Sequence, residues 1–228
     1  MLKVGWTHDE GRHEAEGLRR WDGHGAVELY DVWVAGETTA LLLERARPGV
    51  ELSQALPEEQ QDAVIAEILR RTWVRPGAPH PFRPLAEMCD QWADEAAGTP
   101  PPGLDPAVFK HGVELFRTLP RESADDVLLV TDLHAGNVLS ADREPWLLID
   151  PKPYVGDRHY DPLQHLFTCQ DRLARDPAGV TSRLATLCDL DPERLRHWLF
   201  ARWCVEAAWS PPPDLGRMTT VIGAVAPS

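Results

Sequence analysis

The sequence predicts an α+β fold with a small, strand-rich amino-terminal part and a larger, mainly helical remainder. Three observations support this prediction. Residues 1–46 show the pattern of a strand, a helix and two further strands. From residue 47 onward, long segments carry apolar residues at helical spacing. Between them, residues 127–161 hold short apolar runs that end in polar loops, as buried strands leading into a site do.

The amino-terminal part is expected to begin with a strand over residues 1–6, which carries Lys3. Thr7 to Glu10 has the spacing of a capping box and predicts the start of a helix that carries Glu14. Because Lys3 lies close to the first residue, we expect it on a weakly held edge strand. The two further strands are expected at residues 27–33 and 38–44.

The second part is expected to be built from long helices. Asp105-Pro106 and Asp191-Pro192 each combine an N-cap residue with a proline in the first turn. The predicted helices cover residues 57–74, 84–97, 105–119, 162–174, 178–188 and 191–209, and the tail to residue 228 holds another short one.

Three polar residues follow the buried strand predicted at residues 127–130. Asp132, His134 and Asn137 lie in its loop, and Asp150 ends a later strand at residues 146–149. Phosphoryl transfer needs a carboxylate that orients an acceptor hydroxyl and takes its proton, together with oxygen ligands for magnesium. Asp132 suits the first task, and Asn137 and Asp150 suit the second. The alternative for any single Asp is that it caps a turn.

This pattern resembles the catalytic core of the kinase fold in the aminoglycoside phosphotransferase family. TDLHAGNVL is similar to the catalytic loop, and LLIDPKPYVGD is similar to the metal-binding segment. IDPKPYVGD and YDPLQHL resemble the streptomycin 6-kinase and hydroxyurea phosphotransferase-like branch. The resemblance implies a protein-kinase-like two-lobe fold, with a truncated N-lobe at 1–46 and a mainly helical C-lobe at 47–228 that contains the catalytic core, 127–161. Val130 departs from it, since the loop usually has His at that position.

The resemblance also implies roles for individual residues and two cofactors, ATP and Mg²⁺. Asp132 is the expected catalytic base, and Asn137 and Asp150 are the expected metal ligands. Lys3 is expected to contact the nucleotide phosphates, with Glu14 as its partner. The backbone of Glu44 and Ala46 is expected to bind adenine at the hinge. His134 and Asp161 are expected to support the loop.

The same resemblance places a Gly-rich loop and two strands before the strand that carries Lys3. No G-x-G-x-x-G occurs in the sequence. We therefore expect a chain that starts within the N-lobe and binds ATP weakly, because backbone N–H groups of that loop normally cover the phosphates.

The charge of the chain bears on its partners. A net charge of −13 argues against nucleic acid, whose phosphates need a basic surface. It suits a small cationic substrate, and Asp90, Asp94 and Glu206 are candidates for an acidic wall around it. The alternative is that these carboxylates lie on solvated helix faces.

Two further observations concern the compartment. No apolar stretch is long enough for a membrane span. The four cysteines are widely separated, which is typical of reduced thiols in a cytoplasmic protein.

We predict ATP-dependent O-phosphorylation of a small hydroxylated molecule, first of all an aminoglycoside of the streptomycin type, which would give antibiotic resistance. Three alternatives stay open at this point. The chain could phosphorylate another small metabolite alcohol, or it could bind a ligand without catalysis because the phosphate loop is missing. It could also use Asp132, His134 and Asp150 as a metallohydrolase cluster, although such sites usually have more His ligands.

Overall fold

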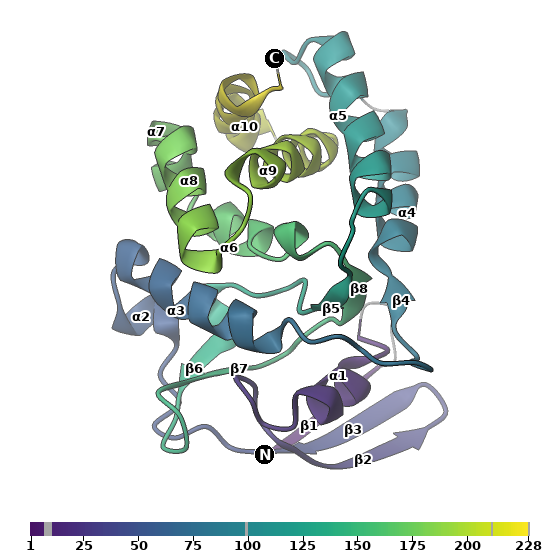
Figure 1. Ribbon diagram of the computed structural model, residues 1–228, viewed down its shortest axis with the longest axis vertical. Coiled ribbons are helices and arrows are strands. Elements are labelled where there is room, and N and C mark those ends of the chain that lie inside the picture. The colour runs from purple at the N-terminus through teal and green to yellow at the C-terminus, as the bar shows by residue number, and fades with distance from the viewer. Residues whose placement is uncertain (7–10, 99, 211, 228) are drawn as a thin grey trace.

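The computed structural model describes residues 1–6, 11–98, 100–210 and 212–227, and its strands and helices separate toward opposite ends (Figure 1). One end holds an antiparallel sheet in the order β1 (Leu2–Trp6), β3 (Thr38–Leu43), β2 (Leu29–Ala35), with α1 (Glu14–Trp21) beside it. This confirms an α+β fold. The capping box predicted at Thr7 to Glu10 lies outside the described residues.

The strand that carries Lys3 is held along its whole length. β1 pairs with β3 in a continuous register from Leu2 opposite Leu42 to Trp6 opposite Thr38. The amino group of Met1 donates a further hydrogen bond to the carbonyl of Leu43. β1 is an edge strand of this sheet, as expected, and its pairing with β3 reaches the first residues of the chain.

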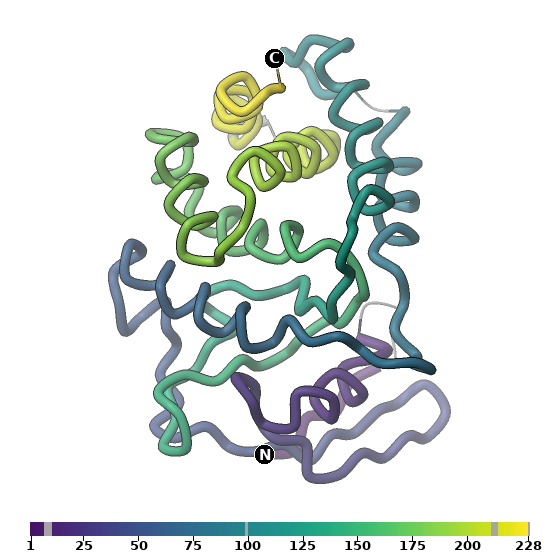
Figure 2. Tube along the Cα trace, viewed as in Figure 1, coloured from purple at the N-terminus to yellow at the C-terminus, as the bar shows by residue number. Residues whose placement is uncertain are grey.

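The other end of the molecule is helical, and α9 (Pro192–Ala207) lies at its centre (Figure 2). Its Trp198 and Trp203 are fully buried. A Cβ atom at Gly112 would lie 2.4 Å from the side chain of Cys204, so a glycine is needed where α5 meets α9. The other helices are α2 (Leu52–Ala55), α3 (Glu58–Thr72), α4 (Leu85–Ala97), α5 (Pro106–Thr118), α6 (Leu163–Thr168), α7 (Gln170–Arg175), α8 (Pro177–Cys188) and α10 (Pro212–Val225).

A hairpin of β6 (Val138–Ser140) and β7 (Trp146–Leu148) links the two ends. On one side, Val27 donates to the carbonyl of Leu148 at 3.0 Å. On the other side, Ser140 donates to the carbonyl of Val50 at 2.9 Å. The segments that follow α1 and β3 thus pair with opposite edges of the hairpin, which ties the small sheet to the residues expected to be catalytic.

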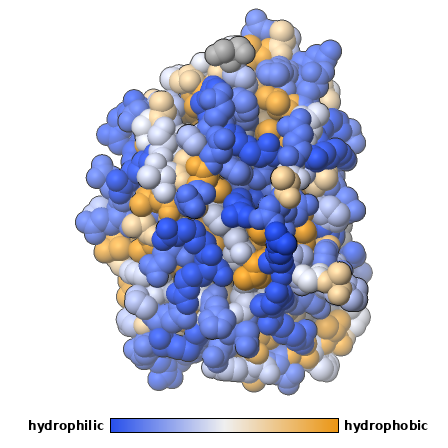
Figure 3. All heavy atoms as spheres, in the orientation of Figure 1, coloured by the Kyte–Doolittle hydropathy of each residue, from blue (hydrophilic) through white to orange (hydrophobic). Residues whose placement is uncertain are grey.

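A second small sheet lies under the helices, in the order β4 (Arg83–Pro84), β8 (Tyr154–Gly156), β5 (Val127–Leu129). All three residues of β5 are buried, which explains its unbroken apolar sequence. Hydrophilic side chains cover much of the face shown in Figure 3. No helix among the described residues is both long and apolar enough to cross a membrane.

Candidate active site

The loop after β5 is held by one buried carboxylate. Asp161 accepts hydrogen bonds from the backbone N–H groups of Val130 (3.0 Å) and Thr131 (2.7 Å) and from the indole N–H of Trp73 (2.9 Å). Burial raises the pKa of Asp161 to about 6 although these donors oppose the shift. Thr131 has a φ of 56°, which a β-branched residue rarely adopts, so the loop needs such a brace. The position of Asp161 fits the loop-supporting role that the resemblance implies.

The carboxylate of Asp132 lies at the tip of this loop and forms an ion pair with the ammonium of Lys152. Lys152 is itself attached to the loop, because its N–H donates to the carbonyl of Val130 at 3.0 Å and its carbonyl accepts from the Thr131 hydroxyl at 2.5 Å. Sequence reasoning missed Lys152. One feature of the sequence could have indicated it: Lys152 is the only basic residue in the segment LLIDPKPYVGD, which was already assigned to the site.

Asn137 and Asp150 lie at the open end of the β6–β7 hairpin. The N–H of Ile149 donates to the carbonyl of Asn137 at 2.9 Å, which keeps the two segments together. The side-chain amide of Asn137 donates to the carbonyl of Asp132 at 3.0 Å, so its nitrogen is engaged and its oxygen is left to bind a cation. Asp150 lies two residues after the end of β7, with a φ of 53°.

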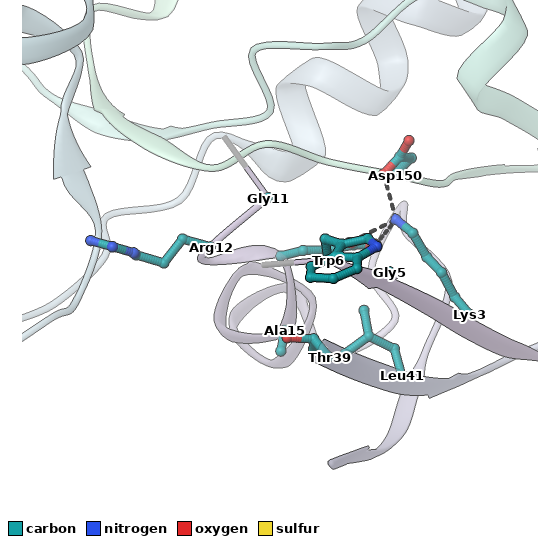
Figure 4. A pocket seen from close by; sticks show the side chains of 10 residues that line it. Lys3, Gly5, Trp6, Gly11, Arg12, Ala15, Thr39, Leu41 and Asp150 are labelled. Atoms are coloured by element: carbon teal, nitrogen blue, oxygen red, sulfur yellow. Dashed lines mark hydrogen bonds and ion pairs between the residues drawn. The ribbon is translucent and has the colours of Figure 1, made fainter. Parts of the chain in front are cut away.

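Lys3 connects the small sheet to this site. Its ammonium lies 2.7 Å from a carboxylate oxygen of Glu14 and 2.5 Å from Oδ1 of Asp150 (Figure 4). Burial lowers the pKa of Lys3, but the hydrogen bonds to Asp150 and Glu14 outweigh it and raise the pKa above its usual value. Burial raises the pKa of Glu14 despite the ion pair with Lys3. A pocket beside Lys3 is also lined by Thr39 and Leu41 of β3.

The donor atoms of Asn137 and Asp150 suit magnesium. Mg²⁺ takes oxygen ligands and usually needs only one or two from the protein, since waters and phosphate oxygens complete its shell. By contrast, the described residues contain no group of three or more His, Cys, Asp or Glu side chains placed to hold a metal. His134 accepts a hydrogen bond from the N–H of Gly136 at 3.1 Å, and burial lowers the pKa of its imidazole. Asp132, His134 and Asp150 thus do not form the cluster that a metallohydrolase would need.

The sequence of the chain is similar to those of known proteins over most of its length. Residues 1–212 match the family described as "Aminoglycoside/hydroxyurea antibiotic resistance kinase". The chain belongs to this family. It is 32% identical to a streptomycin 6-kinase of Streptomyces glaucescens, over 92% of the chain and 70% of that protein. It is 35% identical to a hydroxyurea phosphotransferase of Kitasatospora aureofaciens, over 91% of the chain and 61% of that protein.

Solved structures confirm the protein-kinase-like fold of this family member. The amicoumacin kinase hAmiN superposes with a TM-score of 0.66 at 16% identity, over 99% of the chain and 82% of that structure. The choline kinase LicA from Streptococcus pneumoniae gives a TM-score of 0.62 at 14% identity, over 99% of the chain and 86% of that structure. The prediction of a phosphotransferase that acts on a hydroxyl group is confirmed at the level of the family.

The segment predicted to form the hinge, residues 44–46, takes part in an ion pair. The carboxylate of Glu44 lies 2.7 Å from Nη2 of Arg143, and this hydrogen bond lowers the pKa of Glu44. The N–H of Glu44 donates to the carbonyl of Glu28 at 2.8 Å. Any contact with adenine must therefore use the carbonyl of Glu44 or the backbone of Ala46, and the adenine-binding role of both residues stays a prediction.

The three carboxylates predicted to form an acidic wall around the substrate do not line the pocket beside Asp132, and their role in substrate binding stays a prediction. Asp94 lies 2.5 Å from a guanidinium nitrogen of Arg117, and Asp90 lies at the same distance from Arg121. Arg117 lies on α5 and Arg121 lies in the turn after it, and these arginines neutralise the two carboxylates. Because the pairs join different helices, the local sequence pattern does not reveal them. Glu206 pairs with Arg202 at 2.5 Å and lines a neighbouring hollow.

The pocket that does adjoin Asp132 has a different character. Aromatic side chains and two cations line it, and Asp132 is the one acid among its described lining residues. Arg202 is 8% exposed, and its guanidinium lies 4.4 Å from the ring centre of Trp92. The lining consists of Met88, Trp92, Thr131, Asp132, Lys152, Tyr154, Tyr160, Gln164 and Arg202.

Proposed function

We propose that the chain transfers the γ-phosphoryl group of ATP to a hydroxyl group of a small molecule. The observation that carries this proposal is the meeting of three separate segments at one place. Lys3 of β1, the loop with Asp132 and the end of β7 with Asp150 are joined by ion pairs and hydrogen bonds. Family membership supports the same chemistry. ATP and Mg²⁺ are supplied in the cytoplasm, where we place the activity.

In this reaction the hydroxyl oxygen of the acceptor attacks the γ-phosphorus, and the bond from that phosphorus to the oxygen of the leaving ADP breaks. Asp132 orients the hydroxyl and takes its proton. Lys3, aimed by Glu14, contacts the α- and β-phosphates. Mg²⁺ held by Asn137 and Asp150 would neutralise charge on the phosphates.

Streptomycin-type aminoglycosides are the first candidate acceptors, because two curated relatives are named streptomycin 6-kinases at 32% identity. Hydroxyurea is the second candidate, because a relative at 35% identity is named a hydroxyurea phosphotransferase. The cations that line the pocket beside Asp132 are paired with carboxylates, Lys152 with Asp132 and Arg202 with Glu206, so this pocket does not exclude a cationic acceptor. Another small alcohol stays the third option.

A substrate panel tests this proposal. ADP release is measured with Mg-ATP and streptomycin, hydroxyurea or no acceptor, for the wild-type chain and for Asp132→Asn. We expect acceptor-dependent release by the wild type and a loss of at least about 100-fold in the variant, the size of effect typical of a removed general base. Calorimetry that detects an acceptor but no nucleotide would contradict catalysis and indicate a binding protein.

A further inference from the structure

We propose that Lys152 is a catalytic residue, which holds the Asp132 carboxylate in position and stabilises the transferred phosphoryl group. This proposal rests on the proposed function. It starts from the ion pair between the Lys152 ammonium and Oδ2 of Asp132, the side chain expected to act as base.

The backbone of Lys152 is fixed to the same loop as the base. Its N–H bonds the carbonyl of Val130, and its carbonyl accepts from the hydroxyl of Thr131. Asp161 in turn fixes the N–H groups of Val130 and Thr131. The ammonium is therefore carried on an anchored backbone, and only its flexible side chain needs to move between the base and a nearby phosphate.

The site has more carboxylates than Lys3 alone can neutralise. Glu14, Asp132 and Asp150 bring three carboxylates to this region, and the ammonium of Lys3 is shared between Glu14 and Asp150. Without Lys152, the carboxylate of Asp132 would have no positive partner when negative charge develops on the transferred group beside it. Lys152 therefore acts on the transition state more than on the binding of ATP.

The ion pair also orients the base. Lys152 bonds Oδ2, so the second carboxylate oxygen of Asp132 is left to accept the proton of the acceptor hydroxyl. As the hydroxyl oxygen bonds the γ-phosphorus and ADP departs, negative charge is spread over the equatorial oxygens of the transferred group. The Lys152 ammonium, beside the base, stabilises this charge without forming a bond itself.

Lys152→Met, Lys152→Gln and Lys152→Arg separate this role from a structural one. Lys110→Met is the matched control, because Lys110 is exposed and pairs with Glu114 at 3.8 Å on the surface of α5. We expect kcat to fall about 100-fold in Lys152→Met and Lys152→Gln, with the KM for ATP changed less than about threefold. Lys152→Arg should keep about a tenth of the activity or more, because the charge is retained.

The outcomes distinguish this role from the proposed function. If the wild type neither binds Mg-ATP nor transfers phosphate to any acceptor, the proposed function fails and the role of Lys152 fails with it. If the wild type is active and Lys152→Gln keeps kcat within about twofold while its melting temperature falls, Lys152 is structural and only this proposal is overturned.

Discussion

Two residues at the site adopt a left-handed backbone conformation, which residues other than glycine usually avoid. Thr131 and Asp150 have φ angles of 56° and 53°. Each such residue costs roughly 1 kcal/mol, which the surrounding contacts must offset. Asp161 and Lys152 hold Thr131 from both sides, whereas Asp150 is held by Lys3. The strained residues directly adjoin the groups assigned to catalysis.

Asp150→Asn is expected to weaken magnesium-dependent nucleotide binding about tenfold or more. A neutral amide is a poorer ligand for a hard cation than a carboxylate, and it also loses the charge that pairs with Lys3. Calorimetric titration of ATP at several magnesium concentrations measures the effect. Asp94→Asn is the control, because Asp94 pairs with Arg117 outside the pocket. Unchanged magnesium dependence in Asp150→Asn would show that the ligand assignment is wrong.

The β6–β7 hairpin organises the elements around the site. Arg143, in its turn, reaches the carboxylate of Glu44 and the carbonyls of Gly23 and Ala26 at 2.7 and 2.9 Å. One side chain therefore joins the hairpin to the segments that enter and leave the small sheet. The carboxylate of Glu44 is 12% exposed, so losing this partner would leave a largely buried charge unpaired.

Arg143→Ala should lower the free energy of unfolding by about 1–3 kcal/mol. It should also raise the KM for ATP, since the segment 44–46 expected to bind adenine loses its anchor. Chemical denaturation and steady-state kinetics measure the two effects. Arg19→Ala, which removes only a surface pair with Glu16, should change neither. An unaltered KM in Arg143→Ala would argue against adenine binding at this segment.

A buried ion cluster joins α3 to the helices near the carboxyl terminus. Asp62 accepts from His165 (3.0 Å), Arg172 (2.7 Å) and Arg183 (3.1 Å). Burial lowers the pKa of His165, but the hydrogen bond to Asp62 outweighs it and raises the pKa to about 9. The protonated imidazole is therefore favoured in the folded chain.

This raised pKa predicts a pH dependence of stability. Protonated His165 stabilises the folded state. This stabilisation is fully present below the unfolded pKa of about 6.5 and is lost as pH rises through about 9. The free energy of unfolding should therefore fall by roughly 3 kcal/mol across this window. In His165→Gln this part of the fall should be absent. Parallel curves for the two proteins between pH 6 and 9.5 would refute a charged His165.

Elements with a long sequence pattern could be predicted, whereas those set by tertiary pairing could not. Helical periodicity predicted α3, α4 and α9 within a few residues. β4 and β8 are too short for such a signal and exist through pairing with each other and with β5. The helix predicted at 162–174 is interrupted at Cys169, and we have no physical account of that break.

The residues of the site also divide into those that the sequence pattern indicated and those that only tertiary contacts reveal. Asp132, Asn137 and Asp150 were predicted as site residues because they lie in loops next to short apolar strands, and the structure brings their segments together. The ion pair of Lys152 with Asp132 spans 20 residues, and Arg117 reaches Asp94 across 23, so sequence spacing alone did not reveal either. Asp94, Asp90 and Glu206 each pair with an arginine, and their role in substrate binding stays a prediction.

At the scale of the whole molecule, the reaction is expected where the small sheet meets the helical part. The two chain ends lie far from each other (Figure 2). The lobe boundary after residue 46 stays a prediction. Segments on both sides of that boundary supply charged groups to one site, Lys3 from one and Asp150 from the other.

Phosphorus-31 NMR of the reaction mixture tests the central claim most directly. The chain is incubated with Mg-ATP and, in separate tubes, streptomycin and hydroxyurea. We predict that at least one acceptor gives a new phosphorus signal that is absent without that acceptor, that ADP accumulates in step with it, and that Asp132→Asn gives neither. ATP that stays intact in every tube, or that yields only inorganic phosphate, would contradict transfer to an acceptor hydroxyl.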